Sequence, residues 1–234
     1  MLRNECGPET TVSGLLLFIP RASLPNSIFH RHIQAMKILV LFAHPKISDS
    51  VVQAEMLERI RGLEDVTIHD LYAAYPDFLI DVEHEQALLL QHDLIVFQHP
   101  FYWYSSPAII KEWQYLVLEH DWAYGAKGTK LHGKFMLNAI STGGPEHFYV
   151  HGGKNRFEIR ELLNPFNQTA YLCGMAWLEP FAIFVGRRIP HSDLSRQAEK
   201  YHDLVVGLRD GTLDPLKQIA KNFKLPTSFV ARKD

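Results

Sequence analysis

The stretch "DLIVFQHPFYWYSSPAIIKEW", residues 93–113, decides the fold class because its character changes twice. It opens with an apolar run, residues 93–98, that is typical of a strand buried on both faces of a parallel sheet. It ends in a segment of helical spacing that begins at Pro107, where proline is tolerated in a first turn. Between them stand four aromatic residues, Phe101–Tyr104, where a loop is normally small and polar. Burying such a ring is worth roughly 2–3 kcal/mol, so we expect a flat ligand to cover them.

The same alternation of strand and helix runs along the chain from Met36. The predicted strands are residues 37–43, 66–72, 93–98, 133–141 and 177–186. The predicted helices are residues 51–61, 81–92, 107–119, 156–173 and 192–209. Asp81 is the expected N-cap of the second helix, Ser192 or Asp193 that of the fifth, and Pro165 is expected to break the fourth. Strands that alternate with helices predict an α/β fold with a five-stranded parallel sheet and helices on both faces.

Composition predicts one ordinary globular domain. The chain has 234 residues, of which 47% are hydrophobic and 21% charged, enough to bury a sizeable core. The domain is expected at residues 36–210, because "MKILVLFAHP" starts the first strand with its own methionine. Residues 1–35 are expected to be an unfolded or wrongly included extension, and residues 211–234 a charged tail. No apolar run approaches the roughly 20 residues of a membrane-spanning helix.

Charge and cysteine content exclude several classes of protein. A net charge of -2, a pI near 6.7 and the lack of a Lys/Arg cluster argue against binding to nucleic acid. Cys6 and Cys173 form no C-x-x-C pair, which favours a reducing cytoplasm, and Cys173 is expected to serve packing. His84 and His92 lie eight positions apart, and no H-E-x-x-H occurs, so the sequence predicts no metal site.

Three loops follow predicted strand ends with unusual content, at residues 44–50, 99–106 and 141–154. Ligands of open α/β sheets bind at the carboxyl ends of strands, so these loops define the expected site. The first, "HPKISDS", enters a helix and carries Ser48 and Ser50. A helix amino terminus with hydroxyl donors favours an anion such as a phosphate, although Asp49 or Ser50 can equally serve as an ordinary N-cap.

The third loop, "STGGPEHFY", places two glycines, Gly143 and Gly144, directly after a strand. Glycine lets the backbone approach a ligand closely, but it also serves a simple flexible turn. Neither G-x-G-x-x-G nor G-x-x-x-x-G-K-[ST] is present, so a dinucleotide turn and an NTPase loop are not indicated. A phosphate pocket, an aromatic wall and a glycine wall together predict a flat, phosphorylated cofactor of the flavin mononucleotide kind.

Three segments carry a family resemblance. "ILVLFAHP" with its following serine, "QHPFYWYSSPAIIKEW" and "STGGPEHFY" resemble the signature segments of the flavodoxin-like NAD(P)H quinone oxidoreductases. The stretch "HDLYAAYPDFLIDVEHEQALLLQHDLIVFQHPFYWYSSPAIIKEW" is especially similar to the bacterial ancillary proteins of glutathione-gated potassium-efflux systems. The similarity runs over roughly residues 36–210.

The resemblance implies a flavodoxin-like fold, FMN or FAD as cofactor, NAD(P)H as co-substrate and a quinone as the electron acceptor. It also implies a homodimer with the site at the subunit boundary. An alternative reading is a regulatory ancillary subunit of a potassium-efflux antiporter, at the cytoplasmic face of the inner membrane.

The resemblance also implies roles for single residues. The flavin phosphate is matched by His44, Ser48 and Ser50. The ring-lining loop is matched by Pro100, Phe101, Tyr102, Trp103 and Tyr104. The turn at the pyrimidine edge of the ring is matched by Thr142, Gly143 and Gly144. Tyr149 matches the catalytic tyrosine, and His151 is chosen as its partner, with His147 and Asn155 also near. The family usually has asparagine where Gln53 stands, so that contact departs from its pattern.

Two further readings compete with these. "AISTG", residues 139–143, is one residue from a G-x-S-x-G nucleophile elbow with Ser141 as nucleophile. Too few strands follow Ser141 to supply the acid and histidine loops of a hydrolase. A second aromatic group fits either the dimer interface or the core of one subunit: Trp113, Tyr115, Trp122 and Tyr124.

Overall fold

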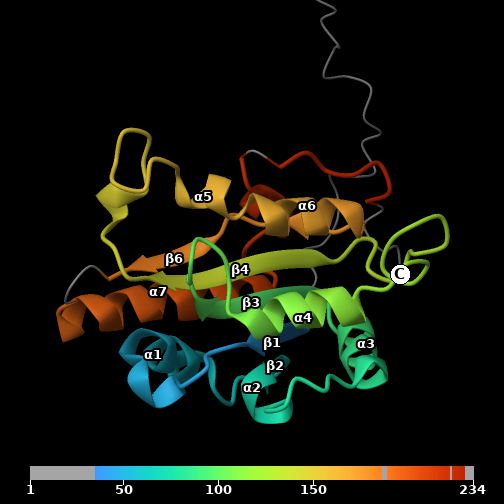
Figure 1. Cartoon of the computed structure of the whole chain (residues 1–234), viewed down its shortest axis with the longest axis horizontal. Helices are drawn as coiled ribbons and strands as arrows, with labels where there is room; N and C mark the ends of the chain where they lie inside the picture. The colour runs from blue at the N-terminus through green and yellow to red at the C-terminus, as the bar shows by residue number, and fades with distance from the viewer. Residues whose placement is uncertain (1–34, 186–188, 222, 230–234) are drawn as a thin grey trace, which may run out of the picture. The chain divides into compact units, whose positions relative to one another are not determined.

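The computed structural model describes residues 35–185, 189–221 and 223–229. Within them one parallel sheet of six strands has the order β2-β1-β3-β4-β5, and β6 also pairs with β4 (Figure 1). The strands are β1 Ile38–Phe42, β2 Val66–Asp70, β3 Leu94–Pro100, β4 Phe135–Thr142, β5 Ala176–Trp177 and β6 Phe181–Phe184. The expected α/β fold with a parallel sheet is confirmed.

The helices fall between the strands in the expected alternation. They are α1 Val51–Ile60, α2 Leu71–Ala74, α3 Val82–Gln91, α4 Ala108–Val117, α5 Ile159–Leu162, α6 Asn164–Leu172 and α7 His191–Arg209. Single 3-10 turns occur at Ile47–Asp49, Glu146–Phe148 and Pro215–Gln218. Asp81 caps α3 as predicted, because its carboxylate accepts the N–H of His84 at 3.0 Å.

Two predicted boundaries were wrong, and one predicted break was right. The second strand ends at Asp70 because that side chain accepts the N–H groups of Tyr72 and Ala73 and starts α2. The segment predicted as one helix broken by Pro165 is divided at Leu163 into α5 and α6, and Pro165 lies in the first turn of α6, where its missing N–H costs nothing. Helix α7 begins directly after Pro190, so neither Ser192 nor Asp193 is its cap.

The predicted fifth strand, residues 177–186, is two short strands instead of one. β5 pairs with the start of β4, and β6 pairs with its second half. Pro180 separates them and has no N–H to give to a ladder. The N–H of the preceding Glu179 leaves the sheet for the carbonyl of Gln218, at 2.7 Å. Residue 186 lies outside the described residues.

The two faces of the sheet carry different helices, because successive side chains of a strand point to opposite faces. On β3, Phe97 packs edge-on against Trp113 of α4, with ring centroids 5.6 Å apart. The next residue, Gln98, points the other way and hydrogen-bonds to side chains of α1 and α7. Every residue of β3 is buried, which explains the apolar run at residues 94–97.

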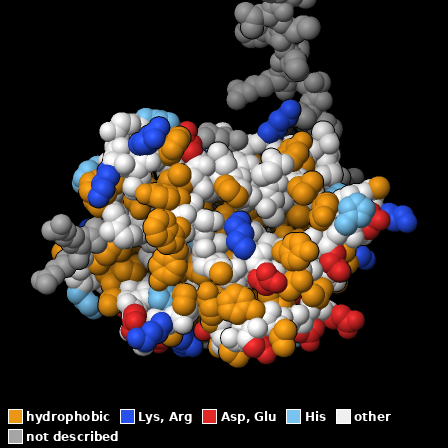
Figure 2. Space-filling model, in the orientation of Figure 1, with side chains coloured by type: hydrophobic (Ala, Val, Ile, Leu, Met, Phe, Trp, Pro, Cys, Tyr) orange, Lys and Arg blue, Asp and Glu red, His pale blue; other side chains and the backbone are white. Residues whose placement is uncertain are grey.

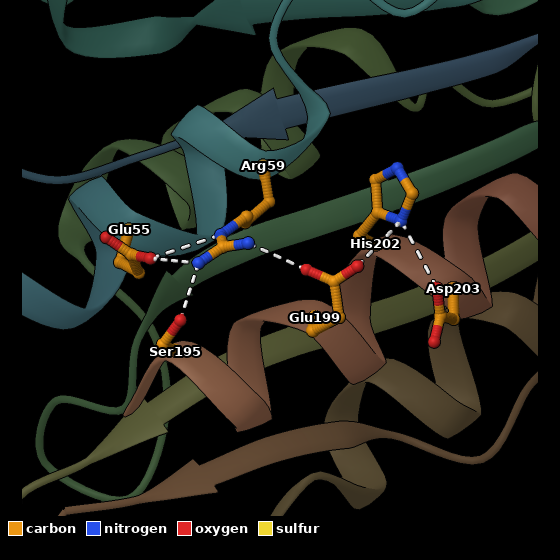
Figure 3. Close-up of polar contacts among 6 residues, drawn as sticks. All are labelled: Glu55, Arg59, Ser195, Glu199, His202 and Asp203. Carbon is orange, nitrogen blue, oxygen red and sulfur yellow. Dashed lines mark hydrogen bonds and ion pairs between the residues drawn. The ribbon is translucent and has the colours of Figure 1, made fainter. Parts of the chain in front are cut away.

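Helices α1 and α7 are joined on their outer side by Arg59, as Figure 3 shows. Its guanidinium bonds to Glu55 at 2.9 Å, to Glu199 at 2.7 Å and to the Ser195 hydroxyl at 2.7 Å. The inner side of α1 buries Met56 and Ile60, which lie at helical spacing. The helix that leads from the first predicted site loop is therefore held by the C-terminal helix.

The second aromatic group divides between core and surface. Trp113 is buried, and Trp122 and Tyr124 are partly buried against the core, as the single-subunit reading expected. Tyr115 is 81% exposed on α4. Cys173 is buried, and burial raises the pKa of its thiol to about 12, so it serves packing.

The described part of the C-terminal segment packs on this domain. Ala220 and Phe223 are buried, Ile219 forms an antiparallel bridge with Leu178, and Phe229 contacts the ring of Phe135. Residues 1–34 lie outside the described residues. None of the described helices is both long and apolar enough to span a bilayer.

Candidate functional site

The three predicted loops leave neighbouring strands β1, β3 and β4 at the same edge of the sheet. The second and third loops enclose a cleft of about 370 Å³. Its lining residues are Phe101, Trp103, Tyr104, Gly143, Gly144, Phe148, Tyr149, Lys154 and Asn155. Figure 2 shows hydrophobic side chains gathered over this end of the molecule, at the left of the view.

The aromatic loop is anchored at its base and strained at its tip. The N–H of Phe101 donates to the carbonyl of Ser141 at 2.8 Å, which ties this loop to the end of β4. Trp103 and Tyr104 have φ angles of 47° and 59°, in the left-handed region that large residues rarely adopt. Trp103 is 93% exposed. Strain and exposure of large rings both cost stability, and such costs concentrate at functional sites.

The glycine loop forms the opposite wall of the cleft and places no side chain there at Gly143 and Gly144. A Cβ placed on Gly143 would meet no atom within 4 Å, so its backbone faces open space. A Cβ on Gly144 would lie 3.1 Å from the ring of Phe148. The Thr142 hydroxyl donates to the carbonyl of Gly144 at 2.8 Å and holds the turn. A ligand can therefore approach the backbone at Gly143 without meeting a side chain.

Tyr149 stands between the two loops. Its ring lies 6.1 Å from that of Phe101 and 5.6 Å from that of Phe184. Burial raises the pKa of its hydroxyl, and hydrogen bonding with Thr142 and Asn155 opposes that rise without cancelling it. The hydroxyl is therefore protonated at neutral pH and is able to donate a hydrogen bond.

The first loop supplies the residues that were expected to hold a phosphate. His44 is buried, and burial lowers its pKa, so the ring is neutral at pH 7. Its Nδ1 accepts the N–H of Lys46 at 3.1 Å, and its ring meets Tyr102 edge-on at 6.2 Å. Ser50 is the N-cap of α1 and accepts the N–H of Gln53 at 3.2 Å.

The cleft brings together Phe101, Trp103, Tyr104, Gly143, Gly144 and Tyr149 of the predicted site. Other predicted site residues lie outside its lining: His44, Ser48, Ser50, Pro100, Tyr102, Thr142 and His151. The His151 side chain is exposed and pairs with Glu161, with 3.4 Å between Nε2 and Oε2.

Three lining residues were not among the predicted site residues. Phe148 and Asn155 are joined by a backbone hydrogen bond of 2.9 Å that folds the loop back on itself. Asn155 also accepts from the Tyr104 hydroxyl at 3.4 Å, which links the two walls. The Lys154 ammonium lies over the ring of Phe148, 5.2 Å from its centroid, which is within the roughly 6 Å of a cation–π contact. Only the path of the loop places them in the cleft, so the sequence pattern offered no signal for Lys154.

The cleft has the chemistry that a flavin requires. Apolar rings stand on one wall, open backbone on the other, and a protonated tyrosine hydroxyl lies between them. Among the described residues, Lys154 is the only charged one in the lining, and it favours an anionic ligand. The residues of the cleft thus fit a flat ring system that carries an anionic group.

Two groups of side chains in the described part of the chain could hold a metal ion, but both are already paired. In the first, Glu85 accepts from Tyr75 at 2.6 Å and from Trp113 at 2.7 Å, and it contacts His69 of the same group at 2.6 Å. The second consists of Glu199, His202 and Asp203, and Figure 3 shows Glu199 bound to Arg59. Neither group lines the cleft.

The hydrolase reading finds no support at Ser141. The residue lies inside β4, and its hydroxyl accepts a hydrogen bond from the side-chain amide of Gln53 at 2.9 Å. A nucleophilic serine needs a base such as histidine at that position.

Fold and site together define a member of the flavodoxin-like class. The model of the flavodoxin-like fold family matches residues 36–205, and the chain belongs to this family.

The chain is also similar to individual proteins of that family. It is 48% identical to the glutathione-regulated potassium-efflux system ancillary protein KefG of Pectobacterium carotovorum, over 72% of this chain and 92% of KefG. It is 48% identical to the NAD(P)H oxidoreductase YrkL of Bacillus subtilis, itself uncharacterised, over 72% of this chain and 97% of YrkL.

The similar solved structures share the fold, but their names describe different activities. General stress protein 14 of Treponema denticola, in complex with FMN, has a TM-score of 0.70 and 36% identity, over 74% of this chain and 99% of that one. An NADPH-quinone reductase from P. pentosaceus has a TM-score of 0.66 and 31% identity, over 73% and 98%. A protein described as a thermophilic tryptophan halogenase, from Streptomycin violaceusniger, has a TM-score of 0.70 and 43% identity, over 72% and 98%.

Proposed function

We propose that the protein is a flavin-dependent NAD(P)H:quinone oxidoreductase. The observation that carries this proposal is the cleft itself, where exposed rings of the aromatic loop face the open backbone of the glycine loop. The names of an NAD(P)H oxidoreductase and an NADPH-quinone reductase among similar proteins support it, as does the FMN complex of a third. FMN is the favoured cofactor over FAD.

A bound flavin supplies a two-electron carrier that is reduced by NAD(P)H and reoxidised by a quinone. The chain's own residues bind and orient that ring. Phe101, Trp103 and Tyr104 cover one side and exclude water. The N–H groups of Gly143 and Gly144 and the Tyr149 hydroxyl would serve as donors to the edge of the ring where negative charge collects, and fixed donors there would stabilise that charge.

The remaining site residues take supporting roles in the proposal. The phosphate binds at the first turn of α1, near Ser48, Ser50 and His44. Pro100, Tyr102 and Thr142 shape the loops around the ring. Asn155 is the better partner for Tyr149 than His151, because Asn155 lines the cleft and His151 does not.

We also propose that the domain at residues 36–210 forms a homodimer located in the cytoplasm. The highly exposed rings of Trp103 and Tyr115 fit an interface rich in aromatic residues. Gel filtration with light scattering checks the assembly, and a monomer would contradict it.

The test of the function is an absorbance spectrum of the purified protein between about 300 and 550 nm, the range of flavin bands. We expect a flavin band, present as purified or after adding FMN, that bleaches with NADPH and returns with a quinone. A protein that binds neither FMN nor FAD would refute the proposal.

A second candidate function is that of a regulatory ancillary subunit of a potassium-efflux antiporter. The 48% identity to KefG over most of that protein's length favours it. Potassium efflux in cells that lack this protein separates the two roles. A pure quinone reductase leaves efflux unchanged, whereas loss of an ancillary subunit reduces it.

A further inference from the structure

A buried row of hydrogen bonds runs beneath the three site loops. The Tyr201 hydroxyl of α7 donates to Gln98 Oε1 at 2.9 Å, and Gln98 Nε2 donates to Gln53 Oε1 at 3.2 Å. Gln53 Nε2 then donates to the Ser141 hydroxyl at 2.9 Å. Tyr201, Gln98 and Gln53 have no exposed surface at all. Buried polar groups of this kind are expensive unless each is satisfied.

The direction of this row is set by a backbone carbonyl. Gln98 Nε2 also lies 3.5 Å from the carbonyl oxygen of Gln53, which can only accept, so the Gln98 amide donates with its nitrogen toward Gln53 and accepts from Tyr201 with its oxygen. Each amide downstream then accepts with its oxygen and donates with its nitrogen. Reversing one amide would place two donors or two acceptors face to face, so neither amide can turn over by itself.

Gln53 is the member of the row that touches the site loops. Its N–H donates to the Ser50 hydroxyl, the cap at the start of α1. Its side chain reaches Ser141, whose carbonyl accepts the N–H of Phe101 at the base of the aromatic loop. One residue therefore fixes the amino end of α1 relative to the end of β4 and the loops that leave it.

We propose that Gln53 is a positioning residue, which sets the distance between the phosphate end and the ring end of the cofactor site. This inference rests on the proposed function. A ligand held at two ends gains affinity from the second contact only when both sites are fixed at the spacing that the ligand has. If Gln53 fixes that spacing, breaking its hydrogen bond to Ser141 reduces the binding affinity that the phosphate adds. The affinity for the ring is then little changed.

FMN and riboflavin provide the test, because they share the ring and differ in the phosphate. The ratio of the Kd for riboflavin to the Kd for FMN measures what the phosphate adds. We expect this ratio to fall about tenfold in Gln53→Met, the worth of one hydrogen bond, with the Kd for riboflavin little changed. Ser141→Ala should reproduce the fall, and the double variant should add nothing to either.

Other outcomes would overturn the proposal. Equal loss of affinity for FMN and riboflavin would show a purely structural role for Gln53, and additive effects in the double variant would show that the two residues act apart. Gln91→Met makes the same change at an exposed position on α3 and should leave the ratio unaltered.

Hydrogen exchange tests the coupling without any flavin. In Ser141→Ala, on β4, we expect faster amide exchange at residues 50–53 than in the unmodified protein. Unchanged exchange there would refute the positioning role. If the protein binds no flavin, the proposed function is refuted. The exchange experiment still decides whether the two loops are joined through Gln53.

Discussion

The imidazole of His99 stacks on the ring of Phe166, with centroids 5.7 Å apart and planes inclined by 22°. His99 is completely buried at the end of β3, and its Nδ1 lies 2.9 Å from the carbonyl of Pro100, to which it must donate. Its Nε2 is left as an acceptor without a partner among the described residues. Burial lowers the pKa of the ring to about 4, and the bond to Pro100 only partly opposes this.

This histidine should make the protein sensitive to mild acid. The unfolded chain binds a proton near pH 6.5 and the folded chain near pH 4, so stability is complete above pH 6.5 and declines as the pH falls toward 4. The difference corresponds to about 3 kcal/mol of unfolding free energy. Urea denaturation between pH 7 and pH 4 measures it. His99→Phe should flatten the decline, whereas the same change at exposed His191 should not.

Trp103→Gly should weaken ligand binding without weakening the fold. The side chain is almost fully exposed and its backbone has positive φ, where glycine is unstrained. We expect the free energy of unfolding to stay the same or rise by about 1 kcal/mol, while the Kd for FMN rises about tenfold through the loss of ring contact. Fluorescence titration and urea denaturation give the two values. Tyr171→Gly, at an exposed position on α6 outside the cleft, should lower stability and leave FMN affinity unchanged.

Tyr149→Phe should slow the reduction of bound flavin by NADPH. The change removes the protonated hydroxyl and keeps the ring contacts with Phe101 and Phe184. We expect the rate to fall about tenfold or more, as for loss of one donor to developing charge, with little change in FMN affinity. Stopped-flow absorbance measures the rate. Tyr171→Phe, at an exposed site on α6, is the matched control, and an unchanged rate in Tyr149→Phe would remove this residue from the mechanism.

Glu85→Gln should destabilise the fold by about 2 kcal/mol. The change replaces one carboxylate oxygen, which accepts hydrogen bonds in the core, by an NH2 group that can only donate. Burial raises the pKa of Glu85, but hydrogen bonds from His69, Tyr75 and Trp113 outweigh it and leave the pKa below 4.5. The native carboxylate therefore adds stability that is present above pH 4.5 and is lost in stronger acid. Urea denaturation at pH 7 and below pH 4 checks both effects. Glu112→Gln, exposed on α4, should change neither.

The sequence by itself determined the fold class. Five-residue apolar runs such as β1 and helical spacing such as that of Met56 and Ile60 are local consequences of burial, so periodicity reveals them. The carboxyl ends of parallel strands meet at one edge, so the three loops could be predicted to leave the sheet at that edge. Asp81 was predictable because a cap depends on three neighbouring residues alone.

Only the tertiary structure decided what depends on residues far apart in the chain. The break between β5 and β6 follows from the hydrogen bond between Glu179 and Gln218, which lie far apart in the chain. The path of the third loop placed Asn155 and Lys154 in the cleft and left His151 outside it. The bond from Gln53 to Ser141 joins residues 88 positions apart, and no local pattern encodes a contact that exists only once the sheet has brought both strand ends together.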